Sequence, residues 1–116
     1  MLEQSKMNQV DAEINRIYNS LNLSGKTQKQ KMDAIYAYVT SMITYEKNTQ
    51  YSPYSYGAFI RKRAQCIGYA EAIYAFMNKA GIDCRIVTGW YNGVGHAWNT
   101  VKYNGKIYHL DATFDR

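Results

Sequence analysis

The sequence contains few of the residues that mark disulfide-stabilised or membrane-spanning proteins. Its 116 residues include two cysteines and one proline, which excludes a disulfide framework as the main source of stability. No run of about 18 apolar residues is present, which excludes a transmembrane helix. The N-terminus also lacks an apolar leader, so the chain is either cytosolic or has lost a leader by processing.

What the sequence does contain is typical of one globular domain. Hydrophobic residues make up 47% and charged residues 20% of the chain, a balance that argues against disorder. The net charge is +5, and only residues 61–63 form a dense basic cluster. We interpret the charge as a solvated basic surface. We expect a monomer that acts on a peptide or protein substrate, without nucleic acid and without membrane insertion.

The periodicity of the apolar residues changes from helical to strand-like along the chain. We expect helices over residues 7–21, 28–43 and 66–80, strands over residues 82–91, 96–103 and 106–110, and a loop over residues 92–95. Thr27 is suited to cap the second helix and Gly81 to end the third. Asn104-Gly105 predicts a tight hairpin. The expected fold is α+β, with two N-terminal helices and a helix bearing Cys66 packed on an antiparallel sheet.

The helical pattern breaks after residue 45. Tyr51, Tyr54 and Tyr56 alternate there with polar residues around the sole proline. These tyrosines either line a substrate cleft or cover the rim of the core, and the sequence favours neither. We therefore divide a single domain, residues 1–116, into a helical part (1–45), a loop (46–62) and a catalytic core (63–116).

Cys66 stands at the expected first turn of the third helix. The unpaired N–H groups and partial positive charge of a helix N-terminus favour a thiolate over a thiol, and the basic cluster just upstream adds to that field. A thiolate is the reactive form of a cysteine nucleophile. Taken alone, however, Cys66 is better explained as a small buried residue, as most cysteines are.

His96 and Asp111 are related through the hairpin that joins them. Counting outward from the Asn104-Gly105 turn, His96 falls level with Asp111 or one or two residues beyond it. The hairpin alone can therefore put an imidazole beside a carboxylate, which is the arrangement of a general base and the group that orients it. With Cys66 presented by a helix packed on the same sheet, the three residues form a nucleophile, a base and an orienter.

The other cysteine and histidine have structural interpretations. Cys84 lies in an expected strand and is interpreted as a buried small residue. His109 shares strand parity with Asp111 and is interpreted as a structural histidine. A Cys66–Cys84 disulfide would silence the site. A zinc site built from both cysteines and both histidines lacks the close spacing of zinc ligands, and we expect neither a metal nor a cofactor.

The oxyanion formed during attack by Cys66 needs hydrogen-bond donors. The backbone N–H of Cys66 is the natural first donor, and Gln65 or Tyr56 is the candidate for the second, although a surface or core role explains either residue as well. Trp98 shares strand parity with His96, so we expect it to wall the cleft, to fill the core, or to do both.

Four segments resemble motifs of the transglutaminase-like superfamily. They are residues 63–70 (RAQCIGYA), 81–89 (GIDCRIVTG), 95–99 (GHAWN) and 106–115 (KIYHLDATFD). Residues 43–45 and 56–59 also resemble segments upstream of the family's cysteine, so the similarity covers roughly residues 27–116. One departure is Phe114, at a position where tryptophan is common in the family.

The resemblance implies a papain-like fold and thiol-dependent acyl transfer on amide bonds, with Cys66, His96 and Asp111 as the catalytic triad. We expect hydrolysis of a protein or cell-wall peptide. The alternatives are a transglutaminase that joins glutamine to lysine or another amine, and a binding module without activity. The resemblance is to the compact bacterial branch, often found on secreted or cell-surface proteins. The end of the chain soon after Asp111 suggests a domain from a longer polypeptide.

Overall fold

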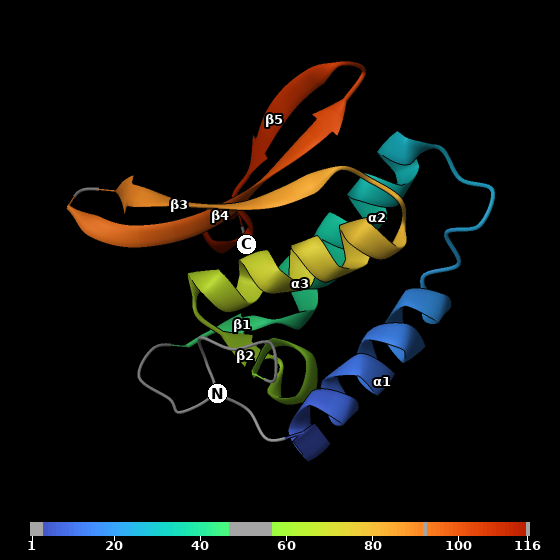
Figure 1. Cartoon of the computed structure of the whole chain (residues 1–116), viewed down its shortest axis with the longest axis horizontal. Coiled ribbons are helices and arrows are strands. Elements are labelled where there is room, and N and C mark those ends of the chain that lie inside the picture. Colours follow the sequence, from blue (N-terminus) through green and yellow to red (C-terminus); the bar gives the residue numbers. More distant parts are fainter. Residues whose placement is uncertain (1–3, 47–56, 92, 116) are drawn as a thin grey trace.

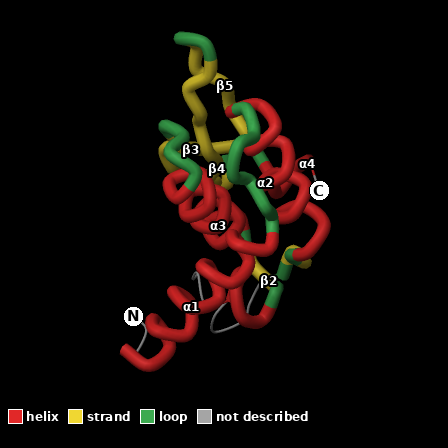
Figure 2. Tube along the Cα trace, turned by 90° about the vertical axis from the view of Figure 1, so that its right-hand side faces the viewer, coloured by secondary structure: helices red, strands yellow, loops and turns green. Residues whose placement is uncertain are grey.

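The computed structural model describes residues 4–46, 57–91 and 93–115. In chain order, the elements are α1 (Gln4–Ser20), α2 (Gln28–Met42), β1 (Thr44–Tyr45), η1 (Gly57–Arg61), β2 (Arg63–Ala64), α3 (Cys66–Lys79), β3 (Cys84–Tyr91), β4 (Val94–Tyr103), β5 (Lys106–Leu110) and α4 (Ala112–Asp115). Figure 1 shows α3 running along the β3–β4 ribbon, with α1 on the far side of α3. The side view in Figure 2 shows the same order of layers.

The ends of two helices form as the sequence predicts. Thr27 Oγ1 accepts a hydrogen bond from the Gln30 N–H at 3.2 Å, and Gln30 Oε1 accepts one from the Thr27 N–H at 3.0 Å, which is a capping box at the start of α2. Gly81, with φ of 77°, follows α3. Its N–H donates to Asn78 O, and the Ile82 N–H donates to Met77 O. This Schellman arrangement turns the chain from α3 into the sheet.

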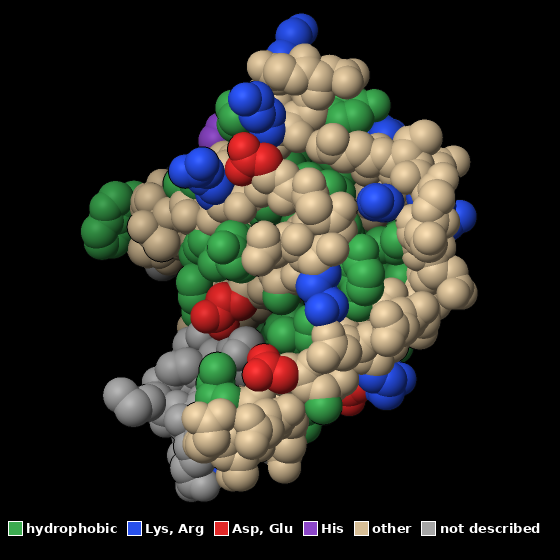
Figure 3. Space-filling model, turned by 45° about the vertical axis from the view of Figure 1, so that its right-hand side comes forward, with side chains coloured by type: hydrophobic (Ala, Val, Ile, Leu, Met, Phe, Trp, Pro, Cys, Tyr) green, Lys and Arg blue, Asp and Glu red, His purple; other side chains and the backbone are tan. Residues whose placement is uncertain are grey.

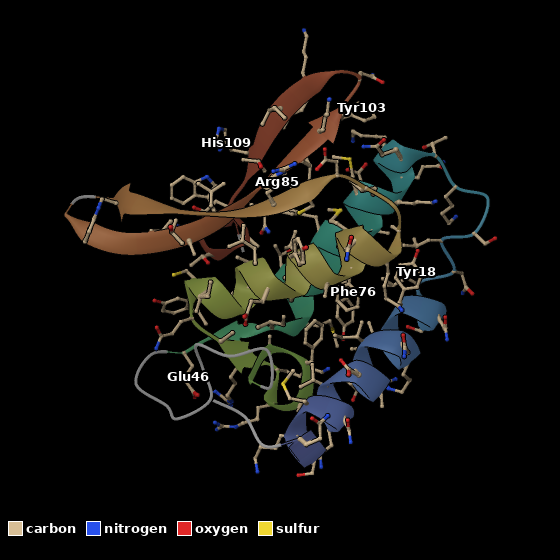
Figure 4. The ribbon with its side chains drawn as sticks, viewed as in Figure 1. Tyr18, Glu46, Phe76, Arg85, Tyr103 and His109 are labelled. Atoms are coloured by element: carbon tan, nitrogen blue, oxygen red, sulfur yellow. The ribbon has the colours of Figure 1, made fainter. Side chains whose placement is uncertain are left out.

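Helix α3 is the centre of the hydrophobic core. Ile73, Phe76 and Met77 on this helix are fully buried. The ring of Phe76 meets the rings of Phe59 and Tyr38 edge to face, with centroid separations of 5.3 and 5.8 Å, the geometry that aromatic quadrupoles favour. Figure 4 shows Phe76 on the side of α3 that faces away from the sheet. The helix is therefore held on both sides, which fixes the position of its first residue, Cys66.

The three-stranded sheet is antiparallel in the order β3-β4-β5. Asn104 and Gly105 both have positive φ, 52° and 77°, as a two-residue hairpin turn requires. Alternation along β4 separates two faces. Ala97, Asn99 and Val101 are buried on the face that packs on α3. Trp98, of the opposite parity, belongs to the other face, called the outer face below.

Part of the predicted loop over residues 92–95 is wrong. Val94 and Gly95 belong to β4, where they pair with Tyr91 and Trp90 of β3. Glycine has weak strand propensity, so the local sequence hides a strand that cross-strand pairing extends.

Two parts of the predicted division contain elements that the sequence did not predict. The helical part, residues 1–45, ends in β1, which pairs in parallel with β2. The loop, residues 46–62, contains the π-helical turn η1. The parallel pairing of β1 and β2 joins segments far apart in the sequence, and no local pattern announces it. Tyr51, Tyr54 and Tyr56 lie outside the described residues, so the two interpretations of these tyrosines both stand.

Candidate active site

His96 and Asp111 form a close pair at the point where β5 ends. The His96 Nε2 and Asp111 Oδ2 atoms are 2.6 Å apart, and the two side chains are 10% and 25% exposed. Because Leu110 pairs with Asn99, Asp111 falls two residues from the level of His96, within the range that the hairpin count predicts. A carboxylate at Nε2 fixes the imidazole tautomer with its proton on that nitrogen. The catalytic role of the pair stays a prediction.

Cys66 is the first residue of α3. The residue before it, Gln65, is the N-cap in extended conformation (φ −87°, ψ −178°), and its side chain makes no capping hydrogen bond. The N–H groups of a first helical turn have no acceptor within the helix, so they lie beside the thiol with their partial positive charge. Cys66 is a free, partly exposed cysteine. The expected helix-start position of Cys66 is thus present.

Asn99 ties the strand that carries His96 to the helix that carries Cys66. Its Nδ2 donates to the carbonyl of Ala70 at 3.0 Å, and the side chain is only 1% exposed. This contact lies one helical turn from Cys66 and three strand residues from His96. Sequence reasoning missed Asn99. The available signal was a polar residue on a strand face whose neighbouring positions, Ala97 and Val101, are apolar.

Cys84 differs from Cys66 in its burial. It is free and buried, and burial raises the pKa of its thiol to about 11. A thiol in that state stays protonated at neutral pH and is a poor nucleophile. The structure therefore agrees with the interpretation of Cys84 as a buried small residue and shows no Cys66–Cys84 disulfide.

His109 and Trp98 lie together on the outer face. Trp98 Nε1 donates to His109 Nδ1 at 3.0 Å, and the rings of His96 and Trp98 lie nearly parallel, 5.7 Å apart between centroids and 23° between planes. Substrate contact by Trp98 stays a prediction, as does a role of Gln65 as oxyanion donor. Tyr56 lies outside the described residues. Within the described part of the chain, no three Cys, His, Asp or Glu side chains are grouped to hold a metal ion.

The basic cluster is partly neutralised by one carboxylate. Glu46, labelled in Figure 4, lies 3.3 Å from Arg63 and 4.0 Å from Arg61. Lys62 has φ of 60°, and burial lowers the pKa of its ammonium group. On the face shown in Figure 3, Lys and Arg side chains are scattered, with Asp and Glu between them. None of the described helices is long and apolar enough to cross a membrane.

A comparison with known families identifies the fold. The model of the transglutaminase-like superfamily matches residues 15–112, which include Cys66, His96 and Asp111. The chain belongs to this superfamily. The membership confirms the predicted family and the α+β transglutaminase core, and it supports cysteine-based acyl transfer as the general class of chemistry.

Two solved structures share the transglutaminase-like fold with this chain. The crystal structure of a TGase superposes with a TM-score of 0.81 at 21% identity, over 97% of this chain and 33% of that one. A candidate cysteine protease from Cytophaga hutchinsonii gives a TM-score of 0.71 at 17% identity, over 97% of this chain and 43% of that one. The chain thus spans less than half of either protein, and likenesses at these identities show the fold alone. No curated protein matches the sequence.

Proposed function

We propose that this domain is a thiol hydrolase of amide bonds in peptides or proteins, with Cys66 as nucleophile, His96 as general base and acid, and Asp111 as the residue that orients His96. The observation that carries the proposal is the 2.6 Å contact between His96 and Asp111, on a strand tied through Asn99 to the helix that Cys66 opens. A polar pair of this kind gains catalytic use only beside a nucleophile. Of the two cysteines, Cys66 is the partly exposed one and stands at the start of a helix.

The tautomer that Asp111 imposes decides which ring nitrogen does the chemistry. With the Nε2 proton donated to Asp111, the lone pair of His96 is on Nδ1. Nδ1 takes the proton of the Cys66 thiol, which leaves a thiolate and an imidazolium. The carboxylate of Asp111 stabilises the positive imidazolium without itself being protonated.

The reaction then proceeds through a thioester. The Cys66 sulfur attacks the amide carbon and the carbonyl electrons move to oxygen, where the Cys66 N–H at the start of α3 donates to the oxyanion. As the oxyanion collapses, the C–N bond breaks and the leaving amine takes the proton from Nδ1. Water then attacks the thioester while Nδ1 accepts its proton, and the acid is released as the thiol re-forms. Water is the default acceptor unless a site excludes it in favour of an amine.

A peptide or protein substrate is supported by the edge of the β3–β4 hairpin. Trp90 is 79% exposed. It pairs with Gly95 and so projects from the face of the sheet that packs on α3, the helix that Cys66 opens. Large, solvent-exposed aromatic side chains are characteristic of surfaces that bind other proteins or peptides.

The experiment uses labelled casein and a biotinylated primary amine, with Cys66→Ser as the inactive variant and Cys84→Ser as the matched control. Hydrolysis predicts that the wild type and Cys84→Ser release peptide fragments or ammonia and that Cys66→Ser releases neither. Incorporation of the amine by the wild type, dependent on Cys66, would instead establish cross-linking. Absence of any reaction, together with a Cys66 that alkylating reagents label no faster than Cys84, would favour the alternative that the domain is a binding module without activity.

A further inference from the structure

The outer face of the sheet carries a chain of contacts that ends on the proposed base. Starting from β5, His109 Nδ1 accepts the indole N–H of Trp98 at 3.0 Å. The indole in turn stacks on the His96 ring, with 5.7 Å between centroids. The far edge of that imidazole meets Asp111. Trp98 on β4 and Asp111, which follows β5, therefore contact the His96 ring directly, and His109 on β5 acts through the indole.

The register of the sheet explains why these side chains meet. His109 pairs with Thr100, so Trp98 is its diagonal neighbour on β4, within reach of a long aromatic side chain. His96 and Trp98 are two residues apart on one strand, a spacing that lets their rings stack. Figure 4 shows His109 on the side of the sheet away from α3, which agrees with this assignment of the outer face.

Gly89 on β3 leaves the space that the indole occupies. A Cβ atom placed on Gly89 would lie 2.9 Å from Trp98 Cη2 and 3.3 Å from Cζ3, closer than such atoms approach without displacement. The ring therefore lies across β3 and rests on the glycine backbone. Trp98 is constrained at three points: by its own strand, by the hydrogen bond to His109, and by contact with Gly89.

We propose that Trp98 and His109 are positioning residues that hold the His96 imidazole in its productive orientation, a proposal that rests on the proposed function of His96. Asp111 contacts one edge of the ring, and the indole of Trp98 lies against the face of the ring. The stacked indole restrains the tilt of the ring, and His109 restrains the indole. For that bond His109 must present an unprotonated Nδ1, since a protonated nitrogen cannot accept.

Two substitutions at His109 test whether its hydrogen-bond acceptor is what matters. In His109→Asn the Oδ1 atom occupies nearly the place of Nδ1 and can accept the indole N–H, whereas His109→Leu has no acceptor. Gly89→Ala tests the other constraint, because its methyl group displaces the indole. Ile107→Thr is the matched control, since Ile107 lies two residues from His109 on β5 with 60% of its surface exposed.

The measurement is the rate at which iodoacetamide alkylates Cys66 in each folded variant at about pH 7.5. This pH lies above the ordinary histidine pKa of about 6.5 and below the ordinary thiol pKa of about 8.5. His96→Ala is the reference for an absent base. We expect His109→Leu and Gly89→Ala to alkylate about 5- to 20-fold more slowly than the wild type, a smaller loss than the roughly 100-fold that a 1 Å misplacement of reacting groups costs. His109→Asn should recover most of the rate, and Ile107→Thr should match the wild type.

The outcomes separate this proposal from the proposed function. If the wild type alkylates no faster than His96→Ala, the Cys66–His96 pair itself is absent and the proposed function fails. If the wild type is faster than His96→Ala but His109→Leu matches the wild type, the function stands and the positioning role is overturned. An equal loss in His109→Leu and His109→Asn would also overturn it, because the loss would then not depend on the acceptor.

Discussion

Replacing Asn99 by alanine tests whether the Asn99 side chain holds the strand that carries His96 to the helix that carries Cys66. The Asn99 amide lies within hydrogen-bond range of three acceptors: Ala70 O at 3.0 Å, Arg85 O at 3.3 Å and Cys84 Sγ at 3.7 Å. The two bonds to carbonyl oxygens contribute about 0.5–1.5 kcal/mol each, and the bond to sulfur less. We therefore expect Asn99→Ala to lower the free energy of unfolding by about 2 kcal/mol.

A second substitution at the same position sharpens the expectation. In Asn99→Asp a carboxylate oxygen replaces the donating nitrogen and faces the Ala70 carbonyl, so only the protonated acid can donate. Its pKa would be raised in the folded state, and stability would fall as the pH rises from the ordinary Asp value of about 3.9 through the folded one. At about pH 7 this variant should be less stable than Asn99→Ala, since a buried carboxylate without a donor is costly.

The assay is urea unfolding at about pH 7, with the Cys66 alkylation rate measured on the folded protein. Thr100→Ser, next in the chain and on the outer face, is the control for a change in β4 itself. Both Asn99 variants should slow the alkylation of Cys66, because the tie between β4 and α3 is lost. If the unfolding free energy of Asn99→Ala lies within about 0.5 kcal/mol of the wild-type value and the alkylation rate of Cys66 is unchanged, Asn99 does not hold β4 to α3.

Three further predictions concern separate parts of the molecule. Phe76→Ala should cost about 3–5 kcal/mol of unfolding free energy in urea, since it empties a fully buried site between two other rings. Burial raises the pKa of Glu71 from its ordinary 4.5 to about 6, so the folded state holds a proton that the unfolded chain releases, and stability falls as the pH rises through that window. Glu71→Gln should therefore stabilise the protein by about 1 kcal/mol at about pH 7, which is half of what the pKa difference represents, because solvent screens a partly exposed group. In urea titrations the unfolding free energies of the two proteins should converge below about pH 4.5. A difference in unfolding free energy that stays the same at every pH would contradict this. Trp90→Ala should raise KM for casein and leave stability within about 0.5 kcal/mol; an unchanged KM would remove Trp90 from the substrate surface.

The sequence was sufficient to predict the elements whose signals are local. The cap at Thr27, the glycine end of α3 at Gly81 and the Asn104-Gly105 turn each follow from short-range backbone chemistry. The hairpin register then placed His96 near Asp111 by counting alone. These predictions needed no knowledge of how distant segments pack.

The features that the sequence did not reveal depend on contacts between distant segments. The β1–β2 pair joins residues 44–45 to residues 63–64, and the tie from Asn99 to Ala70 joins a strand to a helix. Trp98 was interpreted as a wall of the cleft or core, because parity places a side chain on a face without saying what it touches there. The contact between Trp98 and His109 follows only from the register of β4 and β5 and from the room that Gly89 leaves for the indole.

The central claim is that Cys66 is a thiolate nucleophile paired with His96. The most direct test is competitive alkylation by iodoacetamide at about pH 6, below the ordinary thiol pKa of about 8.5, with labelling of each cysteine followed by mass spectrometry. Cys84, whose buried thiol has a pKa of about 11, is the internal control. The account predicts rapid labelling of Cys66, none of Cys84 in the folded protein, and loss of the rapid phase in His96→Ala. Labelling of Cys66 no faster than Cys84, or a rate indifferent to His96→Ala, would contradict it.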